Sequence, residues 1–150
     1  MNEALVIVGV ILTGLLAGNE LGTLVALHPA LRVLPLPAQV AAERALTYRL
    51  RRIMPVAMTA TLVVAVAVAV ALAGDPGFGL GIVAAAALAI MLAITLVGNM
   101  PLNLRTEAFS SEGDAAEWRA IRGRWERLHL VRVGLDLVAF ACLVAALATT

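Results

Sequence analysis

Four long apolar segments fill most of this sequence of 150 residues. They cover residues 4–27, 53–73, 78–99 and 128–148. A helix needs roughly 20 mainly apolar residues to cross the hydrocarbon core of a bilayer, and each segment has about that length. The sequence therefore predicts an all-α integral membrane protein, in which residues 1–150 form a single four-span domain folded as an antiparallel four-helix bundle.

The composition supports this assignment independently of the segment lengths. Hydrophobic residues make up 62% of the chain, charged residues 14%, and the mean hydropathy is +0.98. A soluble domain carries about 25% charged residues. The net charge of +1 argues against a nucleic-acid partner, because such a partner requires a clustered basic surface. We therefore expect the lipid bilayer to be the main partner of this chain.

The basic residues, all eleven of them arginines, are unevenly placed. Five lie in residues 32–52, five in residues 105–127, and Arg132 lies just inside the fourth span. Basic residues accumulate on the cytoplasmic side of membrane proteins. The first and third connections are therefore predicted to be cytoplasmic and both termini external, in a multi-pass protein of the cell membrane. The last helix is then expected to extend into the cytoplasm by about three turns.

A proline marks the predicted end of the first span. Pro29 follows His28, and proline disfavours helical geometry in the residue before it, so we expect this span to end at Leu27. Residues 29–37 are then predicted to form a proline-punctuated loop. Residues 38–52 have a helix-forming composition and should lead directly into the second span.

The later helix ends are likewise predicted from local sequence signals. Residues 75–77 (Asp-Pro-Gly) predict a tight turn that makes the second and third spans an antiparallel hairpin. Pro101 should bend or end the third helix, and residues 105–113 should form a polar loop. Asp114, with Glu117 three residues later, has the spacing of a helix N-cap, so the last helix should begin there.

The first span has two specialised faces. Gly14, Gly18 and Gly22 recur every four residues, which predicts a stripe where another helix can approach closely, including one from a second copy in a homo-oligomer. Glu20 and His28 lie on another side of the same helix. Glu20 is about 160° around the helix axis from the centre of the glycine stripe. The second face is therefore predicted to be polar and to point into the bundle.

The last helix carries the most specific pattern of the chain. Five of its side chains fall within an arc of about 60°, calculated at about 100° per residue: Trp118, Trp125, His129, Arg132 and Asp136. Charged residues within a span usually face the bundle interior or an aqueous cavity. Two plainer explanations remain open, because tryptophans are common anchors at the membrane interface and Arg132 with Asp136 is an ordinary i, i+4 pair.

The antiparallel topology should bring these polar residues together. Near the cytoplasmic face we expect a cluster of five residues: His28, Asn99, Asn103, Trp125 and His129. Glu20 and Asp136 should lie roughly 10 Å deeper in the membrane. An isolated charge there would be costly, so we expect Glu20 either to contact Arg132 or to be protonated.

At these positions the chain resembles the anthrone-oxygenase-like family of small four-helix membrane proteins. The resemblance covers nearly the whole chain and rests on three stretches: His28-Pro29, Asn99-Met-Pro-Leu-Asn103, and Trp118 through Trp125-Glu-Arg-Leu-His129-Leu-Val-Arg132. It implies a membrane four-helix fold. For the characterised branches it also implies oxygenation of aromatic anthrones to quinones by molecular oxygen. The cofactor stays open between none beyond O2 and a metal held by histidines and carboxylates.

A mechanism for such a reaction assigns roles to these side chains. His129 or His28 is the predicted base that removes a proton from the substrate, since imidazole titrates near neutrality. Asn99, Asn103 and Arg132 are expected to hold the developing oxyanion. The predicted substrate-binding residues are Trp125, Trp118, Glu20 and Asp136.

Three alternatives remain open. Each histidine can instead be a hydrogen-bonded structural side chain. Histidines and carboxylates could also bind a metal, although no short ligand motif specifies one. The chain could finally be a nonenzymatic membrane subunit that binds a lipophilic ligand or a partner helix, with its polar residues serving to hold the helices together.

Overall fold

The computed structural model describes residues 2–149 and consists of helices joined by short connections. Four helical rods within these residues are long and apolar enough to cross a membrane: Asn2–Arg32, Leu36–Ala71, Phe78–Ala108 and Ala115–Leu147. The all-α four-helix membrane bundle predicted from the sequence is confirmed.

Two of the rods are single α-helices and two contain a π-helical stretch. The second rod is α3 (Leu36–Ala71), which runs unbroken through Pro55, and the fourth is α6 (Ala115–Leu147). The first rod comprises α1 (Asn2–Gly22), a π-helical stretch (Thr23–Leu27) and α2 (His28–Arg32). The third comprises α4 (Phe78–Ala93), a π-helical stretch (Ile94–Asn99) and α5 (Met100–Ala108).

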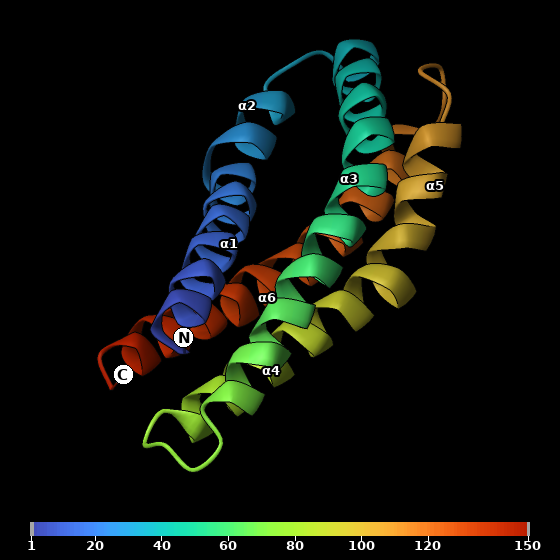
Figure 1. The fold of residues 1–150 in the computed structure, drawn as a ribbon. Helices are drawn as coiled ribbons and strands as arrows, with labels where there is room; N and C mark the ends of the chain where they lie inside the picture. The colour runs from blue at the N-terminus through green and yellow to red at the C-terminus, as the bar shows by residue number, and fades with distance from the viewer. Residues whose placement is uncertain (1, 150) are drawn as a thin grey trace.

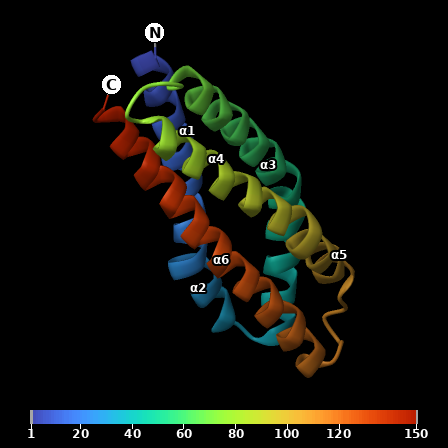
Figure 2. The same cartoon turned by 90° about the horizontal axis from the view of Figure 1, so that it is seen from below.

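The rods pack in an antiparallel square. α1 contacts α3 and α6, and α4 contacts the same two helices from the other side, as the two views of the ribbon show (Figures 1 and 2). The α2–α3 and α5–α6 connections lie at one end of the bundle, whereas the two termini and the α3–α4 turn lie at the other (Figure 1). This arrangement brings α2, α5 and the first turns of α6 to the same end of the molecule.

The predicted end of the first span at Leu27 is wrong, and so is the long loop predicted for residues 29–37. The helix continues to Arg32, and α3 begins at Leu36. The reason is the π-helical stretch, where the His28 N–H bonds to the Thr23 carbonyl, five residues back. This wider turn accommodates Pro29, whose ring would clash with the preceding turn of a regular α-helix.

A π-helical stretch also allows the third rod to continue past Pro101. The Met100 N–H bonds to the Thr95 carbonyl, again five residues back, and the helix continues to Ala108. The loop predicted for residues 105–113 is therefore wrong in its first half. The predicted start of the last helix is confirmed, because the Asp114 side chain accepts a hydrogen bond of 2.9 Å from the Ala116 N–H.

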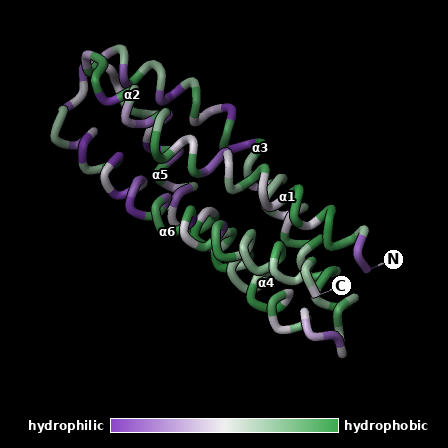
Figure 3. Tube along the Cα trace, turned by 90° about the vertical axis from the view of Figure 1, so that its left-hand side faces the viewer, coloured by the Kyte–Doolittle hydropathy of each residue, from purple (hydrophilic) through white to green (hydrophobic). Residues whose placement is uncertain are grey.

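Hydropathy divides the bundle along its length (Figure 3). The half nearest the termini contains a dry core whose larger members include Val6, Val68, Leu88 and Leu143. The hydrophilic residues gather mainly around α2, α5 and the start of α6. The glycine stripe of α1 is mostly open within one copy of the chain: a Cβ added at Gly18 or Gly22 meets nothing within 4 Å, whereas one at Gly14 meets the Phe140 ring at 3.0 Å.

Candidate functional site

The first buried charge cluster lies between α1 and α6. Arg132 donates a hydrogen bond of 2.5 Å from Nη2 to Glu20 Oε1, and His129 Nδ1 lies 3.2 Å from Glu20 Oε2. None of the three residues is more than 4% exposed. The predicted contact between Glu20 and Arg132 is confirmed. It supplies the nearby opposite charge that a carboxylate needs inside a membrane helix bundle.

A second cluster of the same composition lies closer to the polar end, which is the end of the bundle formed by α2, α5 and the first turns of α6. His28 Nδ1 lies 2.9 Å from Glu43 Oε1, and Arg122 Nη2 lies 3.2 Å from Glu43 Oε2. The side chains come from α2, α3 and α6, and none of the residues is more than 5% exposed. The site thus contains two His–Glu–Arg triads, and in each of them a carboxylate joins a histidine to an arginine.

Both histidines have the same ring nitrogen beside a carboxylate. His28 Nδ1 is hydrogen-bonded to Glu43 Oε1 and also lies 3.2 Å from Arg122 Nη2, whereas His129 Nδ1 lies at ion-pair distance from Glu20 Oε2 without a hydrogen bond in the part of the chain that the structure describes. Within residues 2–149, Nε2 of each ring has no hydrogen-bond partner. When the proton of the neutral ring is on Nδ1, this free nitrogen bears a lone pair, which is the state required of a general base.

Trp125 joins the two triads. Its ring stacks on that of His129 with centroids 4.8 Å apart and an interplanar angle of 28°, and it meets the edge of His28 at 4.8 Å and 70°. The two imidazole centroids are 6.0 Å apart. Trp125 is itself fixed by a hydrogen bond of 2.7 Å from Nε1 to Asn103 Oδ1. The aromatic rings therefore form a rigid unit between the charge clusters.

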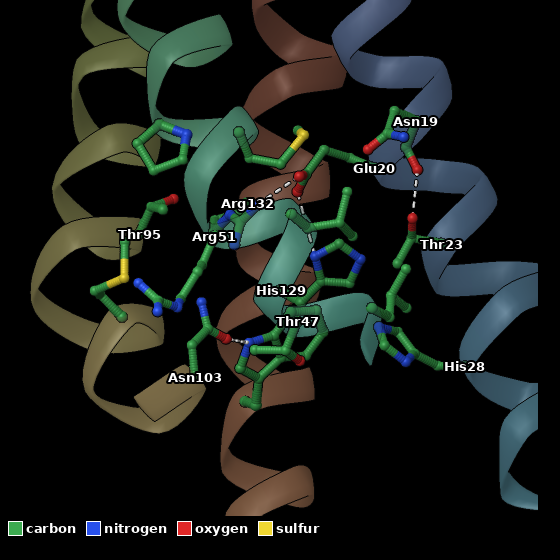
Figure 4. A pocket seen from close by; sticks show the side chains of 16 residues that line it. Asn19, Glu20, Thr23, His28, Thr47, Arg51, Thr95, Asn103, His129 and Arg132 are labelled. Carbon is green, nitrogen blue, oxygen red and sulfur yellow. Dashed lines mark hydrogen bonds and ion pairs between the residues drawn. The ribbon is translucent and has the colours of Figure 1, made fainter. Parts of the chain in front are cut away.

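A small cavity of about 40 Å³ opens beside these rings (Figure 4). Its polar lining includes His28, His129, Arg132, Glu20, Asn103 and Arg51, and its apolar lining includes Leu46, Leu50, Met54 and Met100. Such a volume holds a molecule of the size of water or O2, whereas an apolar cavity that binds benzene measures about 150 Å³. In this conformation the cavity thus admits small molecules but no aromatic ring.

Residues 43–142, most of the chain, match the model of the anthrone oxygenase family. The chain belongs to the anthrone oxygenase family. This confirms the resemblance found in the sequence. No curated protein and no solved structure gives a significant match. The part of the chain that matches the family includes Glu43, Trp125 and His129, whereas Glu20 and His28 precede it.

Three of the residues predicted for the site do not line the cavity. Asn99 is fully buried and donates a hydrogen bond of 3.3 Å to the backbone carbonyl of Trp125, so it ties the third rod to α6. Asp136 is fully buried, and neither of its oxygens has a hydrogen-bond partner within residues 2–149. Trp118 packs against Phe109 at 5.1 Å and lines a separate groove at the polar end.

Two residues of this anthrone oxygenase family member were missed from the sequence, although signals for both existed. Glu43 is the one acidic residue among the five arginines of residues 32–52, a segment predicted to belong to the first cytoplasmic connection. Arg122 continues the spacing of the α6 stripe, four residues after Trp118 and three before Trp125. An acid that stands alone among bases, and a base on a buried stripe, together predict a buried pair.

The described part of the chain contains no cluster of three or more histidine, cysteine, aspartate or glutamate side chains arranged to hold a metal ion. Each triad instead contributes one histidine, one carboxylate and one arginine. A guanidinium has no lone pair to offer a metal and competes for the carboxylate oxygens.

Proposed function

We propose that this protein is a membrane oxygenase that uses O2 to oxidise a lipophilic aromatic substrate of the anthrone type to a quinone. One observation carries the proposal. Two buried histidines line the same cavity, and each has Nδ1 beside a carboxylate and an Nε2 without a hydrogen-bond partner within residues 2–149. A base oriented in this way by a third group is the usual arrangement in proton-transfer catalysis.

The chemistry starts with the loss of a proton. An anthrone has a methylene group between two aromatic rings and opposite a carbonyl, so its C–H bond is acidic for carbon. When a histidine Nε2 takes this proton, the electron pair delocalises to the carbonyl oxygen as an enolate. The carbanion carbon can then form a C–O bond with O2, which needs no further cofactor as oxidant.

The surroundings suit the enolate. Arg132 lines the cavity and places a cation near His129, and Asn103 lines the same cavity. Fixed charges and dipoles in a site shielded from water stabilise a developing oxyanion far better than water does. Asn99 acts only through Trp125, whose backbone carbonyl it holds.

Access for the substrate requires side chains to move. The wall formed by Leu46, Leu50, Met54 and Met100 is apolar, and both methionines are unbranched and adaptable. A flat aromatic molecule dissolved in the bilayer can enlarge the cavity by displacing them, with its reacting edge toward the histidines.

The test measures O2 uptake and quinone formation by the purified protein in lipid nanodiscs with anthrone as the probe. We expect His129→Gln to lower the rate by roughly 100-fold or more, because general bases typically contribute that much. Glu117→Gln is the matched control, since this residue lies in the exposed first turn of α6. Unchanged turnover in folded His129→Gln would rule out this residue as the base.

A nonenzymatic role is the second candidate, and the small volume of the cavity favours it. The protein would then bind a lipophilic ligand or a partner helix, and the triads would hold its helices together. Saturable binding of anthrone by the wild-type protein, with neither O2 uptake nor quinone formation, would establish this role in place of the first.

A further inference from the structure

The proposed oxidation requires two deprotonations of one carbon. Conversion of a CH2 group to C=O by O2 removes two hydrogens and releases one water, so two C–H bonds must break in sequence. The site contains two histidines, each beside a buried carboxylate, with imidazole centroids 6.0 Å apart on the wall of one cavity. A single base would leave the second triad without a function in the reaction.

We propose that the two triads divide this work, an inference that rests on the proposed function. His129, beside Glu20, takes the first C–H proton. His28, beside Glu43, takes the second and thereby drives cleavage of the O–O bond. Glu43 and Arg122 are positioning residues for this second step.

The first step belongs to His129 because its whole triad faces the cavity. Glu20, His129 and Arg132 all line it, as Figure 4 shows around the Glu20 carboxylate. Negative charge appears on the carbonyl oxygen of the substrate in the first deprotonation, and Arg132 is the cation of the two triads that lies on that wall. The enolate is therefore best stabilised next to His129.

The second step belongs to His28 for a stereochemical reason. After the first deprotonation the carbon is planar, and O2 adds to the face that the first proton has vacated. The remaining C–H bond is then turned away from His129. A second base must come from another direction, and His28 lies on the adjacent α1–α2 rod, with its ring at 85° to that of His129.

The steps balance in atoms and electrons. His129 takes a proton and the carbanion transfers two electrons to O2, so that a C–O bond forms and gives a peroxide anion. Protonated His129 returns its proton to the terminal oxygen. His28 then takes the second C–H proton as the C=O bond forms and the O–O bond breaks, and the hydroxide that leaves takes this proton to become water.

Arg122 places positive charge beside His28, with Nη2 3.2 Å from His28 Nδ1, although its side chain does not line the cavity. Its Nη2 binds Glu43, and the same side chain lines a groove of about 450 Å³ at the polar end, together with Arg32 and Arg119. Positive charge thus lies behind His28, on the side that leads away from the apolar half. By contrast, Arg132 lines no part of this groove.

The experiment separates the two deprotonations. Without O2, the wild-type protein should accelerate exchange of the anthrone methylene protons for deuterium, which NMR follows and which reports the first step alone. With O2, absorbance follows quinone formation and a peroxide-sensitive dye follows the hydroperoxide intermediate. Glu117→Gln again serves as the control, with both rates expected to match the wild type.

We expect His129→Gln to lose roughly 100-fold in both rates, because it removes the first base. His28→Gln should keep the exchange rate within about twofold but lose roughly 100-fold in quinone formation, and hydroperoxide should accumulate. Glu43→Gln should also lower the rate of quinone formation more than the exchange rate, but by a smaller factor than His28→Gln. Glu43→Asp should recover part of the rate of quinone formation. A merely structural role for Glu43 would lower both rates together.

Two results would overturn the inference. The first is an equal loss of exchange and quinone formation in His28→Gln and in Glu43→Gln, at wild-type levels of folded protein by size-exclusion chromatography and circular dichroism. If His28→Gln does not assemble, Glu43→Gln carries the comparison. The second is a wild-type protein that accelerates neither exchange nor oxidation, which overturns the proposed function as well. If the wild-type protein forms quinone but no variant loses quinone formation while keeping proton exchange, only the assignment of the two deprotonations to different histidines is overturned.

Discussion

The two halves of the bundle are held together in different ways. In the half near the termini, buried polar groups are satisfied within their own helix, as when the Thr13 and Thr61 hydroxyls donate to carbonyls four residues back. In the other half, buried charged groups pair across helices, as when Glu20 pairs with Arg132, 112 residues later. One half is therefore specified by shape and the other by long-range pairing of charges.

The backbone geometry also changes where the two halves of the bundle meet. Both π-helical stretches lie where the first and third rods enter the polar half, and each is followed by a proline, Pro29 or Pro101. Such stretches are rare and often occur at functional sites. Here one of them leads directly to His28 and the other ends at Asn99, so the irregular backbone accompanies the site residues.

The first prediction concerns the location of each half and has an all-or-none outcome. The arginines of the polar end predict that it is cytoplasmic and that the termini are external. In a Cys142→Ala background, an impermeant thiol reagent added to intact cells should label Asn2→Cys but not Ser110→Cys. Labelling of Ser110→Cys alone from outside would reverse the orientation.

The second prediction breaks the polar half. Arg132→Met leaves Glu20 buried without its partner, and removing one member of a buried ion pair costs about 3–5 kcal/mol. The unfolding midpoint in detergent should fall accordingly. The double variant Glu20→Met with Arg132→Met should recover most of the loss, because it leaves no unpaired charge.

A matched control sharpens this second prediction. Arg32 and Glu126 form an ion pair of 2.6 Å, but the Arg32 side chain is 53% exposed. Glu126→Gln should therefore change the free energy of unfolding by less than about 1 kcal/mol. An equal effect of Arg132→Met and Glu126→Gln would contradict the idea that pairing specifies the polar half.

The third prediction concerns helix packing in the apolar half, where we expect a smaller loss of stability. A Cβ added at Gly81 would lie 2.9 Å from the Ala69 Cα, where α3 and α4 pack backbone to backbone. Gly81→Ala should cost about 1–3 kcal/mol by overpacking, measured by the unfolding midpoint in detergent. Gly18→Ala is the control, since it meets nothing within 4 Å and should be neutral or stabilising.

The glycine stripe can also be tested for assembly between copies. Because Gly18 and Gly22 face open space within one copy, homo-oligomerisation through this stripe remains a proposal. Gly18→Leu should lower the oligomeric mass in detergent without lowering the stability of the single copy, and an unchanged mass would rule out the stripe as an interface.

The fold could be predicted almost completely from the sequence, because the bilayer fixes both the length and the helical state of each span. The convergence of His28, Trp125 and His129 followed from helical spacing and antiparallel topology. Glu43 could not be placed in the same way, since its role depends on α3 lying next to α2. The π-helical stretches were missed because proline is expected to end an α-helix, and local rules do not anticipate the wider turn.

Both arginines that pair with the buried glutamates are supplied by α6, which follows the other three rods in the chain. Until α6 inserts, Glu20 and Glu43 have no guanidinium partner in these pairs, although each belongs to a helix that has already left the ribosome. The order of synthesis thus makes the insertion of α6 the step that supplies the arginine partners of both glutamates. A nascent chain stalled before Ala115 would leave two acidic groups in the membrane without their arginine partners.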